Sequence, residues 1–164
     1  MERKKELAKR LQEVFLDGKW IANTNYTEQI SDVLWVQANT KIHDLNSIAL
    51  LTFHINYYLE GLLHVFNGGP LEISDRYSFN MPDINTEKDW SNLKLKFLTN
   101  AKAFCNKVQT FDDALFDQVF VDEKYGSYLR NIEAVIEHSY YHLGQIVLIK
   151  KMILNHHIRQ DRKS

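Results

Sequence analysis

Residues 129–156 read LRNIEAVIEHSYYHLGQIVLIKKMILNH, a long stretch with the periodicity of an α-helix. Side chains spaced three and four residues apart form one stripe along it, namely Ile132, Val135, Ser139, His142, Ile146, Ile149 and Ile153. A heptad-like repeat of this kind is typical of a helix that packs one apolar face inside a bundle. The stretch therefore predicts a long helix in an all-α fold.

Further segments with a helical period lie at residues 4–22, 47–66 and 87–109. Asn46 can cap the N-terminus of the middle one, and Asn67-Gly68-Gly69-Pro70 can end it. Thr86 and Asp89 are spaced like a capping box at the start of the next. With 164 residues available, the chain predicts a single four-helix-bundle domain over residues 1–164.

The segments that connect the predicted long helices have less regular sequence patterns. Residues 27–30 and 35–40 can form short helical turns between the first two helices. The connection from Gly68 to Asn85 is long and contains aromatic residues such as Phe79, so we expect it to pack across the bundle. Residues 119–128 read as a short β-hairpin or an extended excursion before the last helix.

His138 and His142 are four residues apart in the last predicted helix. Four residues turn an α-helix by about 400°, so both imidazoles lie on one face, roughly 6 Å apart along the axis. Two neutral imidazoles at this spacing can bind one metal ion. His54 lies in the apolar second helix and leans toward the core side. The three histidines indicate a metal site with an open coordination position; hydrogen-bonded or half-exposed imidazoles without a metal are the alternative.

Two familiar helical metal sites do not fit this chain. A zincin helix carries Glu directly after its first His as the general base, and Ser139 occupies that position here. Di-iron bundles use recurring Glu-x-x-His pairs, which do not recur in this sequence. His64 follows His54 by ten residues, about 15 Å along the helix axis, and cannot share an ion with it.

Composition narrows the functional classes. The chain is 45% apolar and 25% charged, and its formal net charge of −1 argues against a nucleic-acid binder. No stretch approaches the roughly 18 apolar residues of a membrane span, the N-terminus lacks a signal-peptide core, and the single Cys105 allows no intrachain disulfide. We therefore expect a cytoplasmic protein that binds neither nucleic acid nor membrane. Basic residues gather near the C-terminus, at Lys150, Lys151, Arg159, Arg162 and Lys163, where a helix end favours them.

Three stretches together resemble the DinB-like superfamily. They are Leu51-Thr52-Phe53-His54-Ile55, Asn67-Gly68-Gly69 and the run from Glu137 to Ile146. The most specific part is the pattern His-x-x-x-His-x-x-Gln, formed by His138, His142 and Gln145. The superfamily includes YfiT-type metal-dependent hydrolases and metal-dependent thiol S-transferases that act with bacillithiol or mycothiol.

The resemblance implies a four-helix bundle of up-down-down-up topology that holds a divalent metal ion. Carried over to this chain, the ligands are His54, His138 and His142, and zinc or nickel is the expected ion. The resemblance also implies a low-molecular-weight thiol as a cofactor and a homodimer. Gln145, three residues after His142, could orient a ligand or a bound water, or be simply a polar residue at the bundle end.

Two function classes follow. In the first, the protein is a metal-dependent transferase or hydrolase that activates a thiol or water for a small-molecule substrate. In the second, it is a non-catalytic, stress-associated protein that binds a metal or a small molecule. A deep pocket at the metal site with a polar residue in reach favours the first class, and a pocket filled by aromatic side chains favours the second.

Overall fold

The structure, a computed structural model, describes residues 2–161, and the surroundings of side chains up to residue 155. Met1 and residues 162–164 of the predicted domain, including Arg162 and Lys163, lie outside the described residues. The described chain is helical and contains no strand, which confirms the all-α prediction. Its α-helices are α1 (Arg3–Phe15), α2 (Tyr26–Ser31), α3 (Trp35–Asn39), α4 (Ile48–Phe66), α5 (Glu87–Gln109) and α6 (Tyr128–Asp161), with short 3₁₀ helices η1 (Asp75–Tyr77), η2 (Asp113–Asp117) and η3 (Glu123–Tyr125).

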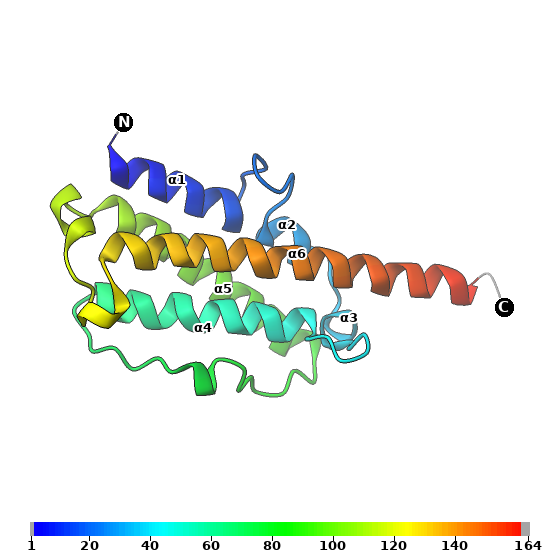
Figure 1. Cartoon of the computed structure of the whole chain (residues 1–164). Coiled ribbons are helices and arrows are strands. Elements are labelled where there is room, and N and C mark those ends of the chain that lie inside the picture. The colour runs from blue at the N-terminus through cyan, green and yellow to red at the C-terminus, as the bar shows by residue number, and fades with distance from the viewer. Residues whose placement is uncertain (1, 162–164) are drawn as a thin grey trace.

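The four long helices pack side by side into a bundle (Figure 1). Each of α1 and α4 contacts both α5 and α6. The segment of residues 67–86, called the strap below, returns along α4, so α5 begins near the end of the bundle at which α4 begins (Figure 1). The C-terminal part of α6 extends beyond the other helices (Figure 1). None of the described helices combines the length and apolar character needed to cross a membrane.

The predicted stripe of α6 faces the core along its whole length. All seven of its members are buried: Ile132, Val135, Ser139, His142, Ile146, Ile149 and Ile153. The bounds of α5 match the predicted 87–109, and its cap forms as predicted, since the Thr86 hydroxyl accepts a hydrogen bond from the Asp89 amide at 3.1 Å. Both short helical turns also form, as α2 and α3.

The prediction that the first helix continues to residue 22 was wrong. α1 ends at Phe15, whose carbonyl oxygen accepts a hydrogen bond from the Thr27 hydroxyl at 2.8 Å. The carbonyl oxygen of Gly18 likewise accepts one from the Asn25 side chain at 3.1 Å. These contacts turn the chain away from the bundle, and Trp20, which a longer helix would have included, is 88% exposed.

Two smaller expectations also need correction. The N-cap of α4 is Ser47 rather than Asn46, because the Ser47 hydroxyl accepts a hydrogen bond from the Leu50 amide at 3.2 Å. The hairpin at 119–128 does not form: a single bridge joins Val119 and Ser127, and the 3₁₀ helix η3 lies between them. The segment instead forms an extended excursion, which was the alternative prediction for these residues.

Candidate metal centre

Contact between α4 and α6 brings the three predicted histidines together. Their ligand nitrogens all lie within 4.8 Å of one another. The Nε2 atom of His138 is 3.2 Å from Nε2 of His54 and 2.9 Å from Nε2 of His142. His54 and His142 are buried, and His138 is half-buried. The structure therefore gathers ring nitrogens from two helices around one point.

Hydrogen bonds fix the tautomers of two of the rings. Nδ1 of His54 is 3.2 Å from the carbonyl oxygen of Ser78, and Nδ1 of His142 is 2.7 Å from Oε1 of Gln145. Both oxygens can only accept, so each Nδ1 carries the proton and donates it. The Nε2 atoms of His54 and His142 then present lone pairs toward the third histidine, as metal-bound imidazoles do.

The arrangement fits a cation better than it fits three neutral rings alone. His138 can donate an Nε2 proton to only one of its two neighbours, so the other nitrogen–nitrogen contact has no proton between its atoms. A cation at the centre would satisfy all three. Metal–nitrogen bonds of about 2.0–2.1 Å in a tetrahedral zinc site place the ligand nitrogens about 3.3 Å apart. The His138–His54 separation of 3.2 Å is close to that value, and the His138–His142 separation of 2.9 Å is shorter.

The environment of the three clustered histidines favours their neutral form at pH 7. Burial lowers the pKa of His54, although its hydrogen bond to Ser78 acts in the other direction. Burial is also the main cause of the lowered pKa of His142. The pKa of His138 falls to about 4, first because of burial and next because a positive charge on His142 or His54 would repel its own. Neutral imidazoles are the form that binds metal.

The strap completes the surroundings of His54. The Phe79 ring stacks on the imidazole, with centroids 4.0 Å apart and planes inclined by 10°. Tyr58 of α4 approaches His54 and His138 edge-on, at centroid distances of 5.1 and 5.5 Å. Its hydroxyl donates to Oδ1 of Asp75 at 2.7 Å. Burial, followed by this bond, raises the pKa of Tyr58 to about 12, so the phenol keeps its proton at neutral pH.

The three histidines and Gln145 could be identified from the sequence, whereas Ser78 and Asp75 could not. Gln145 accepts a hydrogen bond from the His142 ring, a contact that the sequence did not predict. The strap runs along α4 rather than across the bundle (Figure 1), and its packing includes the stacking of Phe79 on His54. His64, as predicted, stands apart from the cluster, with a side chain that is 52% exposed.

A pocket of about 660 Å³ opens beside the cluster and reaches His138. Its polar lining includes Tyr58 and Asp75. His54 and His142 do not line it, so only the half-buried member of the cluster faces this space. A molecule in the pocket would meet the centre from the side of His138.

Acid should destabilise the metal-free protein through His138. The unfolded chain binds a proton at this residue near pH 6.5, whereas the folded chain does so only near its pKa of about 4. Between these values the unfolded state holds more protons, so the free energy of unfolding falls as the pH drops from about 6.5 to about 4. Urea unfolding at pH 7 and pH 5, with a chelator present, measures the loss. His138→Gln should show a smaller loss, and an equal loss would contradict this assignment.

Gln145→Leu should weaken zinc affinity by about 10–100-fold, because the group that orients a ligand imidazole is typically worth that much. The variant removes the oxygen that accepts the His142 Nδ1 proton. Gln145→Glu keeps such an oxygen and serves as the matched control. Competition with a chromogenic chelator measures both affinities. Wild-type affinity in the leucine variant would show that Gln145 has no part in holding the ring.

Comparisons of the chain with protein-family models, with curated proteins and with solved structures found no match. The resemblance to the DinB-like superfamily therefore stays a prediction from the motifs.

Proposed function

We propose that this protein is a metal-dependent enzyme of the hydrolase or thiol-transferase type, with His54, His138 and His142 as the ligands of one divalent ion. The observation that carries the proposal is the convergence of the Nε2 atoms while two of the Nδ1 atoms are held by Ser78 and Gln145. Zinc and nickel both suit a set of three imidazoles.

The ligand set determines the chemistry available. Three neutral imidazoles leave the full 2+ charge on the ion and one or more coordination positions open. When bound, such an ion lowers the pKa of a coordinated water toward about 7, or holds a thiol as thiolate. The protein's own contribution is to fix the rings of His54 and His142 and to cover the His54 face with Phe79.

The pocket favours catalysis over simple metal storage. It adjoins His138 and offers two polar side chains, the Tyr58 hydroxyl and the Asp75 carboxylate, within the same space. Asp75 already accepts a hydrogen bond from Tyr58, so its carboxylate has a fixed orientation. A carboxylate held in this way can orient a polar group of a substrate beside the metal centre, which is the part we propose for it.

Two model reactions test the proposal. Hydrolysis of 4-nitrophenyl acetate reports activation of water, and transfer of glutathione or cysteine to 1-chloro-2,4-dinitrobenzene reports activation of a thiol. Protein loaded with zinc or nickel should accelerate at least one reaction, and His138→Ala treated with the same metal should not. Equal rates for wild type and His138→Ala, with metal bound only to the wild type, would favour the non-catalytic class instead.

A further inference from the structure

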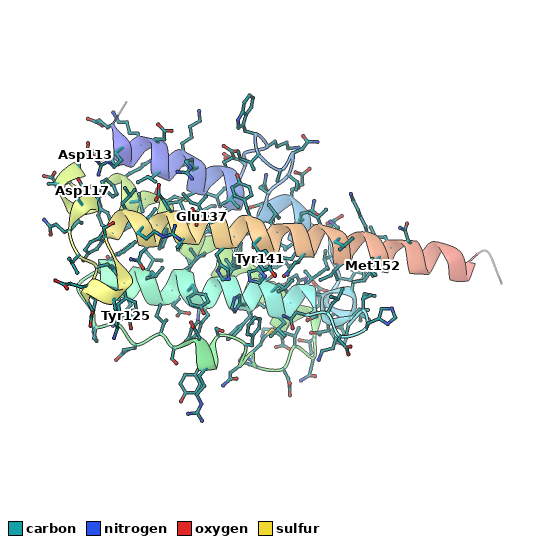
Figure 2. All side chains as sticks on the ribbon, in the orientation of Figure 1. Asp113, Asp117, Tyr125, Glu137, Tyr141 and Met152 are labelled. Atoms are coloured by element: carbon teal, nitrogen blue, oxygen red, sulfur yellow. The ribbon has the colours of Figure 1, made fainter. Side chains whose placement is uncertain are left out.

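The pocket beside the candidate metal centre has a wall that is apolar over somewhat more than half of its surface. It lies between α4, α6, the strap and the excursion that precedes α6, where Figure 2 shows Tyr125. Its apolar lining comes from all four parts: Leu62, Leu71, Ile73, Phe120, Ala134 and Val135. A volume of about 660 Å³ is within the usual range for sites that hold small organic molecules. The apolar part of a ligand could lie against these side chains.

The formal charge on the lining of the pocket is negative. Among the described lining residues, Asp75 is the only one that is formally charged at neutral pH, and none is Lys or Arg. Three basic side chains neighbour lining residues in the sequence, and none of the three lines the pocket. Arg76, next to Asp75, lies over the Tyr77 ring, outside the lining. Arg130 contacts Glu137 at 3.0 Å. Lys124 contacts Asp122 at 3.6 Å and lies over the ring of Tyr125, a lining residue, so its charge is already paired with a carboxylate. Nothing in the wall neutralises a negatively charged ligand body.

We propose that this pocket binds a mainly apolar amine, cationic at neutral pH, with its ammonium group on the Asp75 carboxylate and its apolar body against the wall. The binding of the amine does not depend on the proposed function. Only the placement of the ligand's other end beside His138, as the reacting group, rests on it. Tyr58 leaves most of the acceptor capacity of Asp75 free, because it occupies one position on Oδ1.

Matched probes test the charge preference on protein freed of metal by a chelator. We would titrate ¹⁵N-labelled protein with 4-phenylbutylamine, 4-phenylbutanol and 4-phenylbutyrate at pH 7 and low salt, and follow amide shifts by NMR. Asp75 is exposed, so its ion pair should be worth only about three-fold in affinity over the alcohol. The carboxylate should bind more weakly than the alcohol. Shifts should concentrate at residues 71–75, 120–125 and 131–138.

Two variants separate the charge from the wall. Asp75→Asn should lower amine affinity to that of the alcohol, whereas Asp83→Asn, an exposed carboxylate on the same strap but outside the pocket, should leave it unchanged. Ala134→Trp should fill the pocket and abolish binding of all three probes. Should Ala134→Trp fail to fold, the shift map on the wild type still locates the site.

Three results would overturn the proposal. They are carboxylate affinity equal to or above that of the amine, unchanged amine affinity in Asp75→Asn, and shifts that fall outside the pocket. His142 does not line the pocket, so His142→Ala should bind the amine as the wild type does. Amine binding without metal uptake would therefore refute the proposed function alone, and metal uptake without amine binding would refute this inference alone.

Discussion

His142→Ala is expected to reduce zinc uptake from about one ion per chain to a small fraction of that. The substitution removes one of three imidazole ligands, and the two that remain come from different helices. A site with two protein nitrogens falls short of the three that a catalytic zinc site requires. Equilibrium dialysis against one equivalent of zinc, followed by elemental analysis, measures the loss.

The fold should survive this change. The ring nitrogens of His142 pair with His138 and Gln145, both of which can turn to water when His142 is gone, since neither is fully buried. His64→Ala is the matched control, because His64 also lies in a helix but is exposed and stands apart from the cluster. Equal zinc uptake in both variants would contradict the assignment of His142 as a ligand.

The second large effect concerns stability. Trp90→Ala should lower the free energy of unfolding by about 3–5 kcal/mol, the usual cost of removing a large aromatic side chain from a core. Trp90 is fully buried in α5, and its indole Nε1–H donates to the carbonyl oxygen of Val33 at 2.8 Å. The variant would leave both a cavity and an unpaired buried carbonyl.

Urea unfolding of the metal-free proteins measures this difference. Trp20→Ala provides the control, because Trp20 is 88% exposed and its removal should change stability by no more than about 0.5 kcal/mol. Similar losses in the two variants would mean that Trp90 does not sit in the core as described.

Periodicity predicted the helices well where a helix keeps one face against the bundle. The stripe of α6 is buried from Ile132 to Ile153 because that helix packs along its whole length. The same reasoning failed at the end of α1, since the contact that ends it joins Phe15 to Thr27, twelve residues away. A pattern of side chains within one segment holds no information on such a contact.

The residues of the candidate metal centre could likewise be predicted only in part from the sequence. His138 and His142 could be paired from the sequence because their geometry is local to one helix. His54 joins them only through the packing of α4 on α6, which the sequence suggested through burial and the family resemblance alone. Ser78 and Asp75 lie on the strap, which has no regular period, so no pattern marked them before the structure placed them beside α4.

Anomalous scattering tests the central claim most directly. Crystals of untagged protein grown with one equivalent of zinc, and measured on both sides of the zinc absorption edge, should show one strong peak. We expect it about 2.0–2.1 Å from the Nε2 atoms of His54, His138 and His142. A peak bound elsewhere, for instance at His64, or no peak while the three rings stay in place, would contradict the account.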